Sequence, residues 1–197
     1  MNTSQIITIA LIAIFVFWGV GAYNRLIKLR NEITNAFAQI DVQLKRRHDL
    51  IPNLVEVARK YLEHERETLE RVIAARAQSV AAADLVRSQP NQSGAIKSLN
   101  LAESVLGSAM GRFQAVMESY PELKADQTLR DLSEELTHTE NKVAFSRQLF
   151  NDITLDYNNG IHQFPANLLA GLFGFRTAAM LQSTSSDAER AAVKVAF

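Results

Sequence analysis

The stretch KRRHDLIPNLVE, from Lys45 to Glu56, decides the fold, because it carries a proline inside what otherwise reads as one long helix. A proline in a helix interior removes one hydrogen bond and collides with the carbonyl group four residues earlier, here that of His48. Pro52 therefore marks a break between two helices, a kink in a single helix, or a functional site.

Apolar residues on both sides of Pro52 form a single stripe. Between Arg25 and Arg87 there is no glycine and no other proline. The apolar positions follow one another at spacings that place them on one face of a helix. They are Ile33, Phe37, Ile40, Leu44, Ile51, Val55, Ala58, Leu62, Leu69 and Val72.

The stripe crosses Pro52 with little disturbance. When Arg47 is counted as a stripe position, the step from Ile51 to Val55 is a second consecutive step of four, a stutter that locally unwinds a supercoil without ending a helix. No glycine or turn cluster accompanies it, as a hairpin would require. We therefore predict one long kinked helix. The alternative is two helices, with Asp49 as the N-cap of the second and Pro52 in its first turn.

This choice decides where the apolar segment FPANLLAGLFGF, Phe164 to Phe175, lies. With a kink, the third bundle helix runs away from the membrane and the segment lies at the distal end, which is our prediction. With a reversal at Pro52 there are four bundle helices, and the segment returns to the membrane. In either position it caps the bundle or forms a docking surface for a membrane or a protein.

Two more long helices follow. Residues 88–94, SQPNQSG, have the composition of a turn. Tyr120-Pro121 ends the next helix, because the residue before a proline avoids the α region. The last long helix spans about residues 126–163 and ends at Phe164-Pro165. Its heptad-like stripe comprises Leu129, Leu132, Leu136, Thr139, Val143, Ser146, Phe150, Ile153, Tyr157, Gly160 and Phe164.

Each helix is apolar on one face only and must bury that face against the others. The predicted fold is therefore all-α: an antiparallel bundle of three to four long helices, preceded by one N-terminal transmembrane helix. We expect the bundle to occupy residues 24–176 and the alanine- and serine-rich tail, residues 177–197, to be disordered.

The N-terminal stretch from Ile6 to Ala22 carries no charge and is nearly long enough to cross a bilayer. We predict a transmembrane helix over residues 6–23 and a short extracytoplasmic N-terminus over residues 1–5. Arg25, Lys28 and Arg30 follow the segment, which places the remaining domain in the cytoplasm by the positive-inside rule. The alternative, a signal peptide cleaved after Ala22, lacks the usual basic n-region.

Composition limits the function. The 197-residue chain has 21 basic and 21 acidic residues, which argues against a nucleic-acid-binding protein. It has no cysteine, which excludes disulfides, thiolate metal sites and lipoprotein anchors.

Two short patterns approach metal-binding motifs without completing them. The run from His64 to Thr68 begins like HExxH, but Thr68 stands where the second histidine ligand is needed. Glu135-Leu136-Thr137-His138 matches one element of a di-iron bundle, but the second copy is missing. With no phosphate-binding loop or nucleophile motif either, we predict no metal, no cofactor and no enzymatic activity.

Two charged residues occupy stripe positions, Arg47 and Glu65. A charge there needs a partner or water. The structural interpretation is pairing between helices or exposure beyond the bundle edge, and the functional one is contact with another subunit or protein. The basic run from Lys45 to His48 is either a solvated or ion-paired helix face or a site for anionic lipid.

Several segments, taken in order, resemble the LemA family of bacterial membrane proteins, over about residues 1–176. The resemblance implies a single-pass protein of the bacterial inner membrane with a soluble bundle of about four helices and no established enzymatic activity. It also implies a genomic association with membrane metalloproteases. The segments are Tyr23–Leu26, Arg47–Val55, His64–Leu69, Tyr157–Ile161 and Phe164-Pro165.

We therefore predict a membrane-anchored scaffold or adaptor that acts by protein–protein contact and self-associates into a homo-oligomer. The first alternative is a regulatory or substrate-presenting subunit of a membrane protease in envelope quality control. The second is a metal-dependent enzyme. The candidate interaction or structural positions are Arg47, Asp49, Pro52, Asn53, His64, Glu65, Tyr157, Asn158, Phe164 and Pro165.

Overall fold

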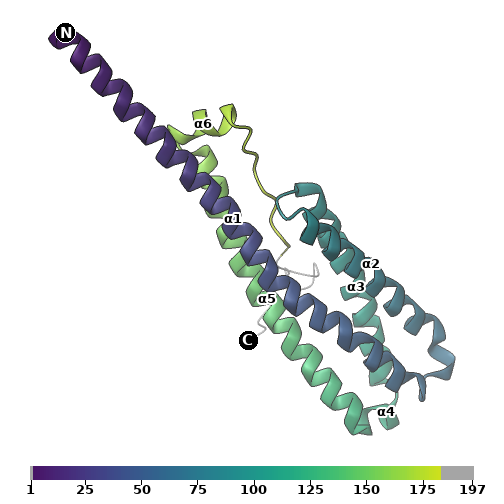
Figure 1. The fold of residues 1–197 in the computed structure, drawn as a ribbon. Helices are drawn as coiled ribbons and strands as arrows, with labels where there is room; N and C mark the ends of the chain where they lie inside the picture. The colour runs from purple at the N-terminus through teal and green to yellow at the C-terminus, as the bar shows by residue number, and fades with distance from the viewer. Residues whose placement is uncertain (1, 183–197) are drawn as a thin grey trace, which may run out of the picture.

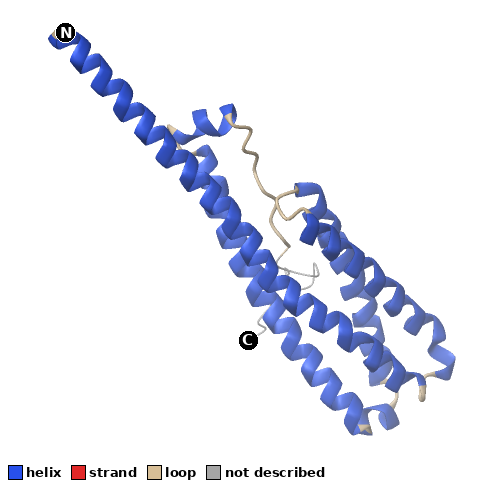
Figure 2. Ribbon diagram, in the orientation of Figure 1, coloured by secondary structure: helices blue, strands red, loops and turns tan. Residues whose placement is uncertain are grey.

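A computed structural model of the chain describes residues 2–182. Over these residues the regular structure is entirely helical (Figure 2), which confirms the predicted all-α fold. The elements are α1 (Thr3–Arg59), a 3₁₀ turn (Glu63–Glu65), α2 (Arg66–Ser88), α3 (Ser93–Glu118), α4 (Pro121–Ala125), α5 (Gln127–His162) and α6 (Ala166–Leu172).

The distal part of α1 and helices α2, α3 and α5 form a four-helix bundle (Figure 1). The bundle consists of two antiparallel pairs: α5 packs along α1, α3 packs along α2, and α1 and α2 join the pairs. The short α4 closes the distal end between α3 and α5. The remaining side of the bundle lies between α3 and α5.

The predicted apolar stripes form the core. Every stripe residue expected along Ile33–Val72 is buried, and Phe37 meets Phe150 edge-on with ring centroids 6.3 Å apart. Along α5 the predicted stripe is buried or half-buried except at Phe164, which is 77% exposed because α5 ends at His162, two residues earlier. Close packing of α1 on α5 uses Gly160, where an added Cβ would lie 3.2 Å from the Leu29 side chain.

Pro52 lies inside α1, which confirms one helix rather than two at this point. The expectation that this helix continues toward Arg87 is wrong, because the chain reverses directly after Arg59. The reversal uses neither glycine nor proline. It is held by tertiary contacts: Leu62 is fully buried, and the Tyr61 hydroxyl donates to Asp126 at the start of α5 (3.1 Å).

This reversal also overturns the predicted place of the apolar segment 164–175. With four bundle helices, α5 ends on the N-terminal side of the bundle, and α6 lies beside α1 (Figure 1). The Tyr23 ring is 4.9 Å from the Phe173 ring, and Gly19 faces Leu169. The segment therefore lies near the predicted membrane segment, not at the distal end.

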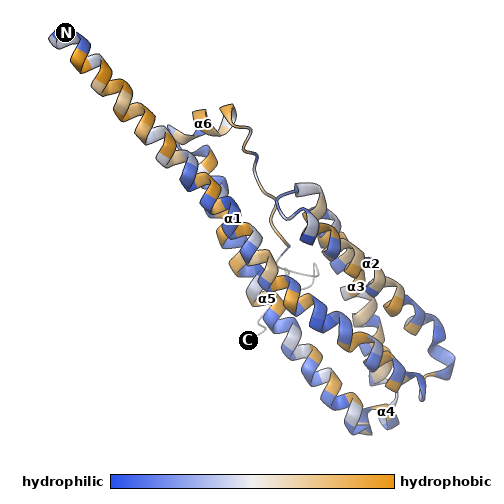
Figure 3. Ribbon diagram, viewed as in Figure 1, coloured by the Kyte–Doolittle hydropathy of each residue, from blue (hydrophilic) through white to orange (hydrophobic). Residues whose placement is uncertain are grey.

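The N-terminal third of α1 projects from the bundle as an apolar rod (Figure 3). By length and composition, α1 is the one helix among residues 2–182 that qualifies as a membrane span. From Leu26 onward, one face of the same helix is buried in the bundle core. The exact limits of the transmembrane segment, residues 6–23, stay a prediction.

After Gly174, which has the positive φ (69°) that favours glycine, the chain runs extended along the bundle. We call residues 175–182 the strap. Its Leu181 is buried, and its backbone is hydrogen-bonded to α3 and α5. The expected disorder is therefore wrong for residues 177–182, whereas residues 183–197 lie outside the described part of the chain.

Candidate functional site

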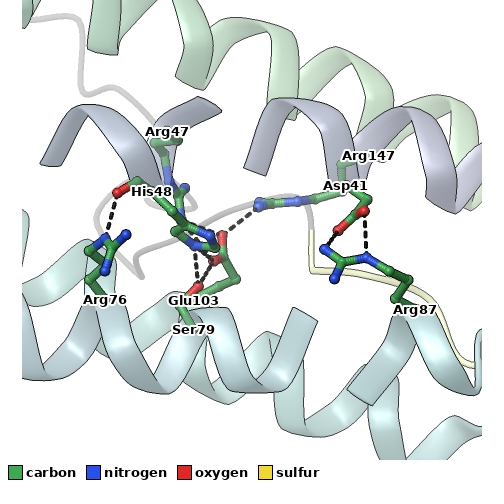
Figure 4. A network of polar contacts seen from close by, with 8 residues as sticks. All are labelled: Asp41, Arg47, His48, Arg76, Ser79, Arg87, Glu103 and Arg147. Carbon is green, nitrogen blue, oxygen red and sulfur yellow. Dashed lines mark hydrogen bonds and ion pairs between the residues drawn. The ribbon is translucent and has the colours of Figure 1, made fainter. Parts of the chain in front are cut away.

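Two polar sites lie in the bundle, and the first surrounds Arg47 on α1 (Figure 4). Its guanidinium Nη2 donates to both carboxylate oxygens of Glu103 on α3, at 2.7 and 2.8 Å. Both side chains are only 11% exposed. The charged stripe position thus pairs between helices, as the structural interpretation of the sequence expects.

Glu103 is the centre of this cluster. Ser79 of α2 donates its hydroxyl to Oε1 at 2.5 Å, and Arg147 of α5 approaches Oε2 at 3.5 Å. Burial by itself raises the pKa of Glu103, but Arg47, the Ser79 hydrogen bond and Arg147 outweigh it, so the pKa lies below its usual value. One carboxylate therefore ties together all four bundle helices.

His48 extends the cluster as a neutral group. Its Nε2 lies 2.8 Å from the Ser79 hydroxyl oxygen, and since that hydroxyl donates to Glu103, Nε2–H is the donor here. Burial, assisted by the positive charge of Arg47, lowers the pKa of His48 to about 4. A serine whose proton goes to a carboxylate, beside a histidine that donates to it, differs from a nucleophilic triad, where histidine accepts the serine proton.

The cluster also explains Pro52. Because proline has no N–H, the carbonyl of His48 loses its partner within the helix. The Nε of Arg76, on α2, donates to this carbonyl instead (Figure 4). Pro52 therefore frees a backbone carbonyl inside α1, and this carbonyl accepts a hydrogen bond from the neighbouring helix α2.

The second polar site is the cleft between α3 and α5 that holds the strap. Asn158 forms two bonds with Ala178, one to its carbonyl (3.0 Å) and one from its amide (2.9 Å). Asn151 does the same with Leu181, at 2.8 and 2.9 Å. Both asparagines lie on α5, two helical turns apart.

The strap is also held at other points. Asn100 of α3 donates to the Met180 carbonyl (3.1 Å) and accepts from the Gln182 amide (3.0 Å). The Tyr157 hydroxyl donates to the Arg176 carbonyl (3.1 Å), and the Ser93 hydroxyl donates to that of Thr177 (3.3 Å). All these bonds are directed to main-chain groups, so the site recognises an extended backbone.

A match to the LemA family model covers residues 36–197. The chain belongs to the LemA family. The match continues through the strap, although the sequence motifs of the resemblance end before it.

Proteins similar to this LemA-family chain include one named LemA and others named MamQ. Protein LemA of Metamycoplasma hominis is 28% identical over 89% of this chain and 76% of its own length. Magnetosome protein MamQ of Magnetospirillum gryphiswaldense is 25% identical over 78% of this chain and 62% of its own, so the chain spans less than two thirds of that relative. MamQ 2 of Paramagnetospirillum magneticum is 24% identical over 92% of this chain. None of these names specifies an enzymatic reaction.

The LemA-family motif residues fall into separate places. Arg47 belongs to the buried cluster and Pro52 acts on it through His48, while Asp49 and Asn53 are exposed on α1. His64 and Glu65 lie on the 3₁₀ turn, and His64 is exposed. Tyr157 and Asn158 bind the strap, whereas Phe164 and Pro165 precede α6 beside the N-terminal part of α1.

Several residues that complete the two sites in this LemA-family chain were not predicted from the sequence. The separation of Arg47 and Glu103 by 56 residues leaves no local signal of their pairing. The seven-residue spacing of Asn151 and Asn158 does place two amides on one face of a helix, and that was the available signal for the strap site. The missed residues are Arg76, Ser79, Asn100, Glu103, Arg147 and Asn151.

Proposed function

We propose that this LemA-family protein is a membrane-anchored scaffold or adaptor that acts by protein–protein contact in the bacterial cell membrane. The observation that carries the proposal is the continuity of α1. One unbroken helix of 57 residues joins an exposed apolar segment to the core of a helical bundle. Such a construction holds a binding domain at a fixed place relative to a bilayer.

A second contact with the bilayer supports this arrangement. Phe164, Leu168 and Leu172 expose 77%, 66% and 78% of their surface on the α6 side of the bundle. Apolar residues exposed at the end nearest a membrane segment suit the interfacial region of a bilayer. In the proposed orientation this end faces the cytoplasmic leaflet of the inner membrane, because Arg25, Lys28 and Arg30 follow the anchor.

The outer face of the α1–α5 pair is the proposed surface for self-association. Val42 on α1 and Phe145 on α5 are 63% and 73% exposed, and Leu149 lies one turn from Phe145. Two contacts set the register of α1 and α5 here: Phe37 packs on Phe150, and Arg46 pairs with Glu135. Val42 and Phe145 lie between these two contacts and therefore at the same level along the bundle. An apolar group of this kind on a polar bundle is typical of a contact surface.

Site-specific crosslinking in intact membranes tests the adaptor proposal, because the natural chain has no cysteine to interfere. We expect Phe145→Cys, with a bifunctional thiol reagent and mass spectrometry, to give crosslinked homo-oligomers. Ala77→Cys, an exposed position on α2, is the matched control and should give few. Equal yields from both positions, or monomer alone from both, would count against the proposal.

The retained anchor has its own test. We expect the membrane-extracted protein to begin with the apolar segment and to resist extraction by alkaline carbonate. A mature N-terminus after Ala22 would instead establish a cleaved signal peptide.

The second candidate function is presentation of substrates to a membrane metalloprotease. One observation favours it: the cleft between α3 and α5 holds a polypeptide in extended form. Deleting the gene and following the half-lives of membrane-protease substrates tests this role. We expect slower turnover of at least some native substrates, and unchanged half-lives would argue against it.

A further inference from the structure

The strap is bound in the manner of a ligand. Eight hydrogen bonds join it to side chains of α3 and α5, and each uses a strap carbonyl or amide group. None of the eight depends on which side chain the strap carries. The cleft therefore selects an extended backbone, and many sequences can supply one.

The spacing of the asparagines matches an extended chain. Asn151 and Asn158 are seven residues apart on α5, a rise of about 10.5 Å along a helix. Ala178 and Leu181, the residues they bind, are three apart, which is about 10 Å in an extended strand. The higher strap residue pairs with the lower helix residue, so the bound chain runs antiparallel to α5.

Side-chain selection at the cleft is limited to a few positions. Leu181 is 4% exposed and belongs to the core cluster that contains Phe37 and Phe150. The small Ala178 and Ala179 pack partly against the same cluster. Met180 and Arg176 are exposed. The cleft therefore favours a bound segment that has a small residue and, three positions later, an aliphatic residue, both uncharged.

The cleft continues beyond the end of the strap. A cavity of about 360 Å³ extends from Gln182 between α3 and α5. Gly107 and Gly111 form part of its α3 wall, and an added Cβ at either would meet no atom within 4 Å. Charged side chains that include Glu103 and Arg147 also line this cavity. The described residues, up to Gln182, leave this cavity open, and it has space for further residues of an extended chain.

We propose that the cleft between α3 and α5 is a binding site for an extended polypeptide segment of a partner protein, which displaces the strap and continues over Gly107 and Gly111. The partner segment carries a small residue and, three positions on, an aliphatic one. This site rests on the proposed adaptor function, since it supplies the adaptor with a contact. The tethered strap has an effective concentration in the millimolar range, so the partner must be concentrated beside it, as a protein in the same membrane is.

The test uses the full-length chain in detergent micelles and a fluorescent peptide with the sequence of residues 175–182, FRTAAMLQ, blocked at both ends. Two variants release the strap without touching a helix: Leu181→Asp puts a charge at the buried position, and Ala178→Pro removes the amide that binds Asn158. We expect both to bind the peptide at least ~10-fold more tightly than the natural chain, measured by fluorescence anisotropy.

Variants of the cleft locate the binding. In the Leu181→Asp chain, the pair Asn151→Ala and Asn158→Ala should weaken peptide binding at least ~10-fold, since four backbone bonds are lost. Asn159→Ala, an exposed neighbour on the same helix, is the matched control and should leave it unchanged. Gly107→Leu should weaken a probe lengthened by four alanines while sparing the short probe.

The proposal is overturned if both strap variants, shown to be helical by circular dichroism, bind the probe no more tightly than the natural chain does. Insensitivity to Asn151→Ala with Asn158→Ala would also overturn it. If the natural chain forms dimers that the probe dissociates, the occupant is a second copy, and the partner-peptide proposal fails. Crosslinking from Phe145→Cys tests the adaptor proposal independently of the cleft, because that position lies outside it.

Discussion

The bundle contains two polar sites that differ in almost every physical respect. The cluster around Glu103 is buried and charged, and it draws one or more side chains from each of the four bundle helices. The strap site is partly exposed and neutral, and its asparagines bind only backbone. Removing one partner from a buried ion pair is costly, whereas exchanging one neutral, half-exposed hydrogen bond for another costs little.

The difference teaches that polarity serves two purposes here. The cluster fixes which helices meet and in which register, because Glu103 is satisfied only when Arg47, Ser79 and Arg147 all face it. The strap site fixes no register between helices. In the proposed role it holds a segment that leaves while the four-helix core remains, as a binding site requires.

The largest expected effect comes from breaking the cluster. Glu103→Ala removes the carboxylate that pairs with the buried Arg47 and Arg147, and we expect it to lower the free energy of unfolding by about 3–5 kcal/mol. Urea denaturation followed by circular dichroism measures this. Glu118→Ala, an exposed position on the same helix, is the control and should change stability by less than about 0.5 kcal/mol. Similar values for the two variants would remove the structural role assigned to the cluster.

The next effect tests the link between Pro52 and Arg76. Arg76→Ala leaves the His48 carbonyl without its donor and should cost about 1–3 kcal/mol of stability. In a Pro52→Ala background the backbone amide at position 52 can bond to that carbonyl, so the same Arg76→Ala change should cost less than half as much. Arg71→Ala, an exposed arginine of α2, is the control in both backgrounds. Equal costs for Arg76→Ala in the two backgrounds would disprove the link.

A smaller effect is expected at the strap site. Asn158→Ala removes two hydrogen bonds to Ala178 at a partly exposed place, and we expect a loss of about 1.5 kcal/mol. The bundle should still unfold in one cooperative step. A spin label at Met180→Cys should gain mobility in the Asn158→Ala chain but not in the Asn159→Ala chain. A label that stays immobile in both would show that Asn158 does not hold the strap.

The smallest effect is a dependence of stability on pH that arises from His48. The pKa of His48 is about 4 in the folded chain against an ordinary 6.5, so between these values the unfolded chain binds the extra proton. Stability therefore falls as the pH falls from 6.5 toward 4. We expect a loss of about 0.7 kcal/mol between about pH 7 and about pH 6, measured by urea denaturation. His48→Gln should flatten this dependence, and an undiminished slope in that variant would assign it to another group.

The sequence was sufficient to predict the helical segments and their buried faces, although not every helix boundary. The stripe from Ile33 to Val72 is periodic, and periodicity survives whatever the helices pack against. The passage of α1 through Pro52 was also predictable, because the stripe kept its phase across the proline. Arg47 could be identified as needing a partner, but a contact with a residue 56 positions away leaves no local trace.

The reversal after Arg59 was not predictable for a different reason. Turn prediction depends on glycine and proline, and this turn is instead held by Leu62 in the core and by Tyr61 bonded to Asp126, 65 residues later. The error in the place of α6 followed directly, since one missed reversal exchanges the two ends of the bundle. The strap was missed because its order comes from the asparagines of other helices, whereas its own composition is that of a loose tail.

The continuity of α1 has a mechanical consequence. At 57 residues the helix is about 85 Å long, so a bilayer that holds its first third leaves a lever of roughly 50 Å on the other side. Transmembrane helices tilt to match the thickness of the surrounding lipid. With no hinge between the two parts, a change of about 10° in tilt would swing the far end of the bundle by roughly 9 Å. Such a protein converts the thickness of its membrane into the position of its domain.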